Sequence, residues 1–155
     1  MQKILFVCLG NICRSPLAEG IMLKLIHEKN IQLEVDSAGT SDFHIGEMPD
    51  LRTIENAKNH GVNLTTLRAR QFSEKDFDTF DKIYVMDQSN FTNVLALCKN
   101  DEQSQKVDLL LNTIYPGKNL QVPDPYFGGE EGFEKVFKMV NEACLKIITI
   151  QKNEL

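Results

Sequence analysis

The sequence predicts an α/β domain with a mostly parallel sheet and helices on both of its faces. Residues 4–7 form a continuous apolar run, which is typical of a parallel strand buried on both sides. After this run, strand-like and helix-like segments alternate along the chain. Its 155 residues suffice for one domain with a substantial core and are few for two, so we expect a single domain over residues 1–155.

The other elements follow from apolar spacing and from residues that begin or end helices. Short aliphatic segments predict further strands at residues 32–35, 82–86 and 107–111. Residues 36–39 are expected to form a turn after the first of these. Ser15 suits an N-cap and Pro16 the first position of a helix, and Gly61 suits the end of another. Apolar residues at helical spacing predict helices from Ser15 onward and over residues 50–60, 89–97 and 132–152.

The overall composition excludes several classes of protein. Hydrophobic residues make up 42% and charged residues 25%, which argues against a disordered chain. No apolar stretch approaches the roughly 20 residues of a membrane-spanning helix. The net charge of −5 disfavours sequence-independent binding to nucleic acid. The beginning of the chain, with Lys3 as its one basic residue before the break at Gly10, does not resemble a secretory signal. We therefore expect a cytoplasmic protein with no membrane span and no nucleic-acid partner, as a monomer or weak dimer.

The chain has four cysteines and three histidines, and neither set suggests a metal site. The cysteines are Cys8, Cys13, Cys98 and Cys144, and the histidines are His27, His44 and His60. The size of the chain and the surroundings of Cys8 favour free thiols in a reducing compartment over a disulfide framework. The histidines are scattered and form no metal-ligand pattern with the cysteines, so we expect neither a metal nor another cofactor.

Residues 8–15 are the most informative segment of the chain. They lie between the first strand and the first helix, where backbone N–H groups and the helix dipole favour an anion. Cys8 opens the segment and supplies a nucleophile, and Arg14 follows after five residues with a planar, permanently charged fork for an oxyanion. The pattern predicts a phosphate-binding loop with a thiolate at its floor. The residues expected to hold the phosphate are Leu9, Gly10, Asn11, Ile12, Cys13, Arg14 and Ser15.

Several motifs together resemble those of the low-molecular-weight protein tyrosine phosphatases. These motifs lie at residues 7–16, 36–39, 41–42, 69–71, 86–90 and 124–128, so that the resemblance covers nearly the whole chain. A Cys-x5-Arg pattern alone is weak, but its position near the N-terminus and the Asp-Pro-Tyr at residue 124 make it specific. The resemblance implies a flavodoxin-like, four-stranded parallel sheet. It also implies hydrolysis of phosphotyrosine in proteins, and of aryl phosphates, through a phosphocysteine intermediate without a metal.

The resemblance assigns three catalytic residues, and the chemistry of each suits its role. Cys8 attacks phosphorus, and Arg14 holds two equatorial oxygens of the phosphoryl group. The hydroxyl of Ser15 donates to the Cys8 sulfur and eases its departure from the intermediate. Asp124 protonates the phenolate and then activates water, while Pro125 stiffens its segment.

Other residues are expected to shape the site. Tyr126 and Phe127 wall the cleft on one side and stack on the substrate ring, with a place in the core as the alternative. Phe43 forms the other wall or is equally a core aromatic. Asn11 suits a left-handed backbone and a scaffolding role. Ser37 either joins the network of Asn11 or is a simple turn hydroxyl. Arg70 and Asp87 either form a supporting ion pair or are solvated surface residues. Cys13 either forms a reversible disulfide with Cys8, as the resemblance implies, or is a packing residue.

Three positions depart from the family pattern. Phe43 stands where the family often has tryptophan or tyrosine, and Phe127 where it often has a second tyrosine. Both keep an apolar wall but lose a polar group, which affects the preference for substrates at the rim. Leu67 stands where the family often has a histidine. We expect the hydrogen-bond network around the loop to lack one partner there, with the chemistry intact.

Two rival functions fit parts of the pattern. An arsenate reductase could use the same fold and a similar loop, but it needs a pair of shuttle cysteines after the third strand, where only Cys98 lies. A non-catalytic phosphotyrosine-binding module is the other rival, and the presence of Cys8, Arg14 and Asp124 argues against it. A thioredoxin-like oxidoreductase is disfavoured because the chain has no Cys-x-x-Cys.

Overall fold

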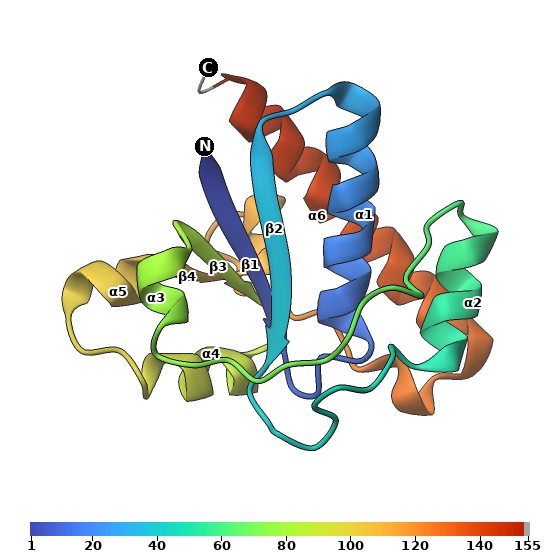
Figure 1. Cartoon of the computed structure of the whole chain (residues 1–155), viewed down its shortest axis with the longest axis horizontal. Coiled ribbons are helices and arrows are strands. Elements are labelled where there is room, and N and C mark those ends of the chain that lie inside the picture. The colour runs from blue at the N-terminus through green and yellow to red at the C-terminus, as the bar shows by residue number, and fades with distance from the viewer. Residues whose placement is uncertain (154–155) are drawn as a thin grey trace.

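A computed structural model describes residues 1–153 of the chain. Its centre is a four-stranded sheet in which every neighbouring pair of strands is parallel (Figure 1). In spatial order the strands are β2 (Leu33–Gly39), β1 (Gln2–Cys8), β3 (Lys82–Val85) and β4 (Val107–Leu109). The predicted fold class, an α/β sheet of four parallel strands with helices on both faces, is confirmed.

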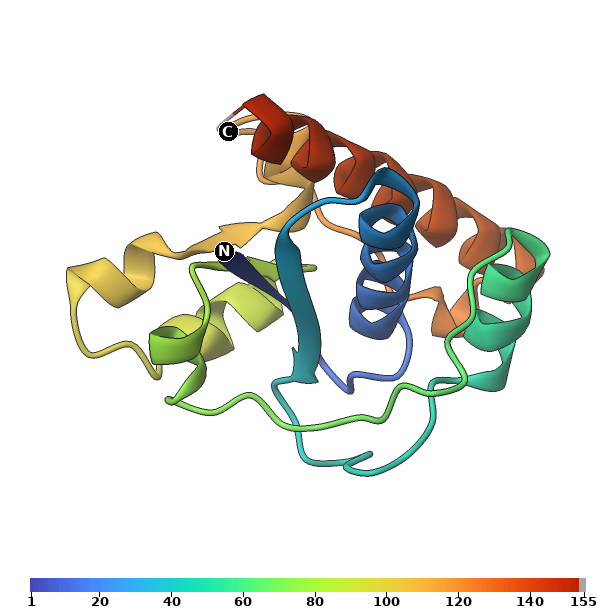
Figure 2. The same ribbon diagram turned by 45° about the horizontal axis from the view of Figure 1, so that its top comes forward.

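Helices cover both faces of this sheet. Those described are α1 (Arg14–Lys29), α2 (Leu51–Asn59), α3 (Asp76–Thr79), α4 (Gln88–Leu95), α5 (Asp101–Gln105) and α6 (Gly129–Asn153), together with the short 3-10 helices η1 (Leu110–Thr113) and η2 (Pro125–Phe127). Figures 1 and 2 show α1, α2 and α6 on one side of the strands and α3 and α4 on the other. None of the helices within residues 1–153 is long and apolar enough to cross a membrane.

Two hydrophobic cores result, one on each face of the sheet. Ile4 and Phe6 of β1 point into the core that α1 and α6 cover. Leu5 and Val7 alternate with them and point into the second core. All four side chains are fully buried, because successive residues of a strand face opposite sides. This double burial is the physical reason for the continuous apolar run at residues 4–7.

The connections of β1 create the position for a ligand site. The chain leaves β1 through α1 to β2 on one side of it, and then crosses to β3 on the other side. The space beyond the carboxyl end of β1 is therefore a topological switch point, where open parallel sheets bind ligands. The loop between β1 and α1 lies at this edge (Figure 2).

Two predictions at this edge were wrong in detail. Residues 36–39 are not a turn but the end of β2, because their register with β1 continues to the pair of Cys8 and Gly39. Ser15 is not an N-cap, since α1 begins at Arg14 and the capping position belongs to Cys13, which makes no side-chain capping bond. The hydroxyl of Ser15 bonds to side chains of the loop instead.

Elements of the second half differ more from expectation. β4 ends at Leu109 and η1 begins at Leu110, so the expected strand is two residues shorter; α6 begins at Gly129, three residues before the expected start. The helices α3 and α5 were not predicted. They have only four and five residues, too few to show an apolar periodicity, and Asn100 caps α5 through its side chain.

Candidate active site

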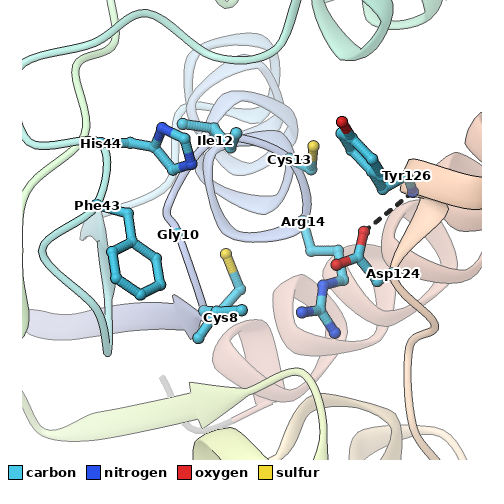
Figure 3. A pocket seen from close by; sticks show the side chains of 10 residues that line it. Cys8, Gly10, Ile12, Cys13, Arg14, Phe43, His44, Asp124 and Tyr126 are labelled. Carbon is cyan, nitrogen blue, oxygen red and sulfur yellow. Dashed lines mark hydrogen bonds between the residues drawn. The ribbon is translucent and has the colours of Figure 1, made fainter.

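One pocket of about 310 Å³ lies at the carboxyl edge of the sheet, and its lining contains the predicted catalytic residues. Figure 3 shows Phe43 and His44 on one side of the Cys8 sulfur, with Asp124 and Tyr126 on the other. Arg14 lies between Cys8 and Asp124 in this view. The lining consists of Cys8, Leu9, Gly10, Ile12, Cys13, Arg14, Phe43, His44, Asp124 and Tyr126.

Cys8 is the last residue of β1 and lies at the bottom of this pocket. Its side chain is nearly buried, and its Sγ lies 2.9 Å from the Oγ of Ser15. The hydroxyl is the stronger donor of the two, so a thiolate at Cys8 would accept a hydrogen bond from Ser15. Ser15 itself is fully buried and stands behind the pocket rather than in its lining.

Neighbouring segments hold the carbonyl groups of the loop. The N–H of Thr40 donates to the carbonyl of Cys8, and the N–H of Ser41 donates to that of Leu9, both at 2.9 Å. The N–H of Asp50 donates to the carbonyl of Ile12 at 2.8 Å. These bonds hold the loop carbonyls against the surrounding chain. Such an arrangement suits a loop whose backbone N–H groups bind an anion.

Asn11 is the scaffold of the loop, as predicted. Its backbone has a φ of 57°, in the left-handed region that asparagine tolerates better than most residues. Its side-chain Nδ2 donates to the hydroxyls of Ser15 and Ser37, at 2.7 and 2.9 Å, and its Oδ1 accepts from the N–H of Arg70 at 3.0 Å. The predicted participation of Ser37 in this network is confirmed.

Arg14 is held from behind by a carboxylate and a carbonyl. Its Nη1 donates to Asp87 at 2.7 Å and to the backbone oxygen of Val122 at 2.9 Å. Burial alone would lower the pKa of Arg14, but the negative charges of Cys8 and Asp87 hold that pKa above its ordinary value. The pocket therefore contains a fixed cation beside the Cys8 sulfur.

The carboxylate of Asp124 lies at the rim of the pocket, where η2 begins. One of its oxygens accepts from the N–H of Tyr126 at 3.0 Å, which fixes the side chain at the N-terminus of this short helix (Figure 3). The rings of Tyr126 and Phe43 border the same opening and are largely exposed. The side chain of Phe127, the third predicted wall, is outside the part of the structure that is described.

Cys13 lines the same pocket as Cys8, and both are free thiols. Burial raises the pKa of the Cys13 thiol to about 12, against a smaller opposite effect of the nearby Thr53 hydroxyl. At neutral pH, Cys13 is therefore a protonated thiol. Cys98 and Cys144 lie away from the pocket lining.

The expected ion pair between Arg70 and Asp87 is wrong, because each has other partners. Arg70 binds Asp36 at 3.0 Å and Asp76 at 3.1 Å, whereas Asp87 binds Arg14. Both residues nevertheless support the loop, since Arg70 also donates its backbone N–H to Asn11. Residues so far apart in sequence carry no local signal for their pairing.

The consequence expected of Leu67 is not observed. This side chain packs against the first core and adds no polar group, yet every side-chain polar atom of Asn11 has a partner. The backbone N–H of Arg70 donates to the side-chain oxygen of Asn11, and Glu19 accepts a hydrogen bond from Ser37 at 2.6 Å. The side chain of Asn11 is thus fully hydrogen-bonded without a histidine at position 67.

Sequence reasoning missed two residues of the site. His44 lines the pocket beside Phe43, and its ring binds Glu47 at 2.7 Å. Glu19 lies on α1, one turn beyond the loop, and accepts a hydrogen bond from Ser37. The sequence could have indicated it only as an acidic residue that stands among the buried positions of this helix. No group of three or more histidine, cysteine or acidic side chains within residues 1–153 could hold a metal.

The fold and the pocket define a class of proteins. A Cys-x5-Arg loop at the carboxyl edge of a parallel sheet, with a buried cation beside the sulfur and a carboxylate at the rim, is suited to phosphate esters. Such a site belongs to the phosphatases of the α/β class.

Comparison with known proteins gives the family. Residues 3–155 match the model of the low molecular weight phosphotyrosine protein phosphatase family. A putative low molecular weight protein-tyrosine-phosphatase of Synechocystis is 43% identical over 99% of both chains. The structure of a protein tyrosine phosphatase from Entamoeba histolytica superposes with a TM-score of 0.90 at 37% identity, over all of both chains. A Drosophila arginine phosphatase superposes with a TM-score of 0.87 at 34% identity, over 96% of each chain.

The chain therefore belongs to the low molecular weight phosphotyrosine protein phosphatases. It is an enzyme that hydrolyses phosphotyrosine, and its substrates are phosphoproteins.

Proposed function

We propose that Cys8, Arg14 and Asp124 are the catalytic residues of this phosphatase. The observation that carries the proposal is that Asp124, which is distant in sequence from Cys8 and Arg14, lines the same pocket as these two residues at the switch point of the sheet. The Cys8 sulfur attacks phosphorus and forms a phosphocysteine, while the phenolic oxygen leaves. Arg14 and the amides of residues 9–14 hold the equatorial oxygens, where negative charge is spread during the transfer.

Asp124 acts as an acid in the first step and as a base in the second. It protonates the departing phenolate, and the resulting carboxylate then takes a proton from the water that attacks the phosphocysteine. The bond from Tyr126 to one oxygen of Asp124 supports this role, because it holds the carboxyl group at the pocket opening. The Ser15 hydroxyl at 2.9 Å stabilises the Cys8 thiolate as it departs.

The proposed substrate is a phosphotyrosine in a protein, with Phe43 and Tyr126 on either side of its ring. Both aromatic side chains border the pocket and are exposed to an incoming substrate. We further propose that the chain acts as a single domain and as a monomer or weak dimer. A cytoplasmic location fits the four free cysteines, which need a reducing compartment.

Hydrolysis of a phosphotyrosine peptide and of para-nitrophenyl phosphate by the wild type and by Cys8→Ser tests this assignment. In the presence of a chelator, we expect the wild type to release phosphate from both substrates and Cys8→Ser to release none. Trapping of a phosphorylated enzyme during turnover, absent in Cys8→Ser, identifies the intermediate. Turnover by Cys8→Ser at the wild-type rate would refute the role of Cys8.

Two further assays separate this activity from its rivals. A phosphoarginine peptide is included because one similar structure is that of an arginine phosphatase. We expect little turnover of it, since the walls of the pocket are aromatic and suit a phenyl ring. An arsenate-reduction assay is expected to show no activity. Faster turnover of phosphoarginine, or reduction of arsenate, would overturn the proposed substrate.

A further inference from the structure

Asp124, the proposed acid, lies on a segment that has few hydrogen bonds of its own. Pro123 and Pro125 flank it, and neither has a backbone N–H to donate. Within residues 1–153, the carboxylate of Asp124 has one hydrogen bond, which it accepts from the N–H of Tyr126 at 3.0 Å (Figure 3). The helix η2 that follows Asp124 has only three residues. The position of the acid in the pocket therefore depends on what holds Tyr126.

The side chain of Arg52, in the first turn of α2, contacts Tyr126 in two ways. Its Nη1 donates to the backbone oxygen of Tyr126 at 3.3 Å. Its Cζ lies 5.0 Å from the centroid of the Tyr126 ring, within the range of a cation–π contact. The same Cζ lies 4.8 Å from the ring centroid of Phe133 on α6. Arg52 thus binds both the backbone and the ring of the residue on which Asp124 depends.

Asp50 holds this guanidinium next to the phosphate loop. Its two carboxylate oxygens accept from Nε and Nη2 of Arg52, each at 3.2 Å, and only arginine offers such a two-pronged contact. The N–H of Asp50 donates to the carbonyl of Ile12 in the phosphate loop at 2.8 Å. The N-terminal turn of α2 therefore contacts the loop of the nucleophile through Asp50 and the segment of the acid through Arg52.

Other residues keep α2 on α6, so Arg52 is not needed for that purpose. Near the C-terminal end of α2, the side chains of Asn56 and His60 bind the carboxylate of Glu134 on α6, at 3.1 and 2.6 Å. The ring of His60 also stacks on that of Phe137, with centroids 3.8 Å apart. The side chain of Arg52 is about half exposed, and exposed ion pairs add little to stability. Removal of Arg52 should therefore leave α2 in place.

We propose that Arg52 is a positioning residue for general acid catalysis, which acts through Tyr126 to keep the Asp124 carboxyl at the leaving oxygen of the substrate. The inference rests on the proposed role of Asp124 as the acid. Without the guanidinium of Arg52, η2 loses an attachment to α2. The carboxyl then lies within hydrogen-bond reach of the leaving oxygen for less of the time, and protonation of that oxygen becomes slower.

A misplaced acid has a signature in the dependence on the leaving group. Phenyl phosphate and para-nitrophenyl phosphate have similar shapes, so both present one aromatic ring to the walls of the pocket. Phenolate is far more basic than para-nitrophenolate and depends more on protonation as it leaves. A comparison of the two substrates therefore reports on the acid rather than on binding at the rim. The quantity to compare is kcat/KM, because it includes the step in which the leaving group departs.

The experiment measures kcat/KM of both substrates for Arg52→Ala and the wild type. We expect a loss of about 5- to 10-fold with phenyl phosphate and of about 2-fold with para-nitrophenyl phosphate, since the acid is misplaced rather than removed. Arg52→Lys keeps the charge but not the fork that binds Asp50 and Tyr126 together, and it should show the same difference. Lys58→Ala removes a positive charge from an exposed position of the same helix and should match the wild type with both substrates.

A double variant tests whether Arg52 acts through Asp124. If it does, Arg52→Ala added to Asp124→Asn causes no further loss with phenyl phosphate, whereas independent effects would multiply. Equal losses of Arg52→Ala with the two substrates, no loss at all, or multiplying effects in the double variant would each overturn the inference. Asp124→Asn alone separates this failure from that of the proposed function, because equal losses with both leaving groups in that variant would refute the acid itself.

Discussion

Asp124 is the residue whose role depends most on the leaving group. Asparagine at this position keeps the side-chain oxygen that accepts from Tyr126, but its amide N–H groups are not acidic enough to protonate a leaving group. We expect Asp124→Asn to lower kcat for a phosphotyrosine peptide by about 10²- to 10³-fold, because a tyrosine phenolate needs protonation as it leaves. The loss with para-nitrophenyl phosphate, whose leaving group is far less basic, should be about 10-fold. Asp42→Asn, which changes a nearby exposed carboxylate, is the control, and equal losses on both substrates would exclude Asp124 as the acid.

Cys13 is expected to protect Cys8 against irreversible oxidation. Hydrogen peroxide oxidises the Cys8 thiolate to a sulfenic acid, and the Cys13 sulfur then displaces water to form a disulfide. Because burial raises the pKa of Cys13 to about 12, its thiolate fraction is small and the second step should speed up about tenfold for each unit of pH between about 6 and 9. The measurement is the loss of two free thiols per chain after peroxide.

The matched variant for this prediction is Cys13→Ser. Dithiothreitol should restore activity to the oxidised wild type, since a disulfide can be reduced, and should fail with Cys13→Ser after prolonged peroxide, since over-oxidised cysteine cannot. Cys144→Ser removes a buried thiol outside the pocket and should recover like the wild type. Equal recovery of Cys13→Ser and the wild type would contradict the protective role.

Individual residues of the site differed in how well the sequence predicted them. Cys8 and Arg14 belong to one short segment, so their proximity was readable from spacing alone. Asp124 depended on the family resemblance, because nothing local indicates which strand edge it approaches. Glu19 could not be found, since its partner Ser37 is 18 residues away and reaches it only through the pairing of β1 with β2.

Asp87 links the N-terminus of α4 to the phosphate loop. One of its oxygens caps α4 by accepting from the N–H of Asn90, and the other accepts from Arg14. Asp87→Asn keeps the capping oxygen but places an amide donor or a weaker neutral acceptor against the guanidinium. We expect kcat/KM to fall about 10- to 100-fold, because a charge-assisted bond that orients Arg14 is worth about 1.5–3 kcal/mol. Steady-state kinetics with a phosphotyrosine peptide measures this.

Asn90 gives the control for the capping function. Its side chain completes the capping box by accepting from the N–H of Asp87, and within residues 1–153 it forms no hydrogen bond with Arg14. Asn90→Ala should therefore cost about 1 kcal/mol of stability with kcat/KM unchanged. A large loss of kcat/KM in Asn90→Ala would mean that α4 itself, rather than the bond to Arg14, controls the site.

Gly39 brings β2 into direct contact with the phosphate loop. A Cβ at this position would lie 2.8 Å from the carbonyl oxygen of Leu9 and 3.0 Å from the N–H nitrogen of Asn11. Backbone cannot move aside as a flexible side chain can, so Gly39→Ala must displace the loop. We expect a loss of about 1–3 kcal/mol in stability, typical of overpacking. We also expect a fall of kcat/KM by more than about 10-fold, since misplacement of the reacting groups is costly.

Gly132 is the matched control for Gly39. It lies in the first turn of α6, and a Cβ there would meet nothing closer than 3.5 Å. Gly132→Ala should raise the stability by up to about 1 kcal/mol and leave kcat/KM unchanged. Chemical unfolding and steady-state kinetics of both variants check the pair, and an unaltered kcat/KM in Gly39→Ala would show that the loop tolerates displacement.

The strands and long helices were predictable because burial leaves a periodic trace in the sequence. The run at residues 4–7 reports a strand buried on both faces, and the apolar spacing over residues 132–152 reports the long helix. The end of β2 was read as a turn because Ser37 and Gly39 are typical turn residues, and their pairing with β1 overrides that preference. α1 and α6 begin one and three residues before the predicted starts, because apolar spacing locates the body of a helix better than its first turn.

Considered over the whole molecule, Glu19 couples the stability of the fold to pH. The carboxyl has a pKa near 4.5 in the unfolded chain, and burial raises the pKa of Glu19 to about 7 in the fold. Below about pH 4.5 both states hold the proton, so Glu19 costs nothing. As the pH rises to 7, the unfolded chain releases this proton while the folded chain keeps it, and stability falls. Above pH 7 the full loss, up to about 3 kcal/mol, is present.

Replacing Glu19 by glutamine should remove this loss. We expect the free energy of unfolding of Glu19→Gln, measured by urea denaturation, to exceed that of the wild type by up to about 3 kcal/mol more at pH 8 than at pH 4. Glu28→Gln, with its exposed carboxylate on α1, should leave the pH dependence unchanged. A parallel pH dependence in Glu19→Gln and the wild type would show that Glu19 ionises as easily in the fold as in the unfolded chain.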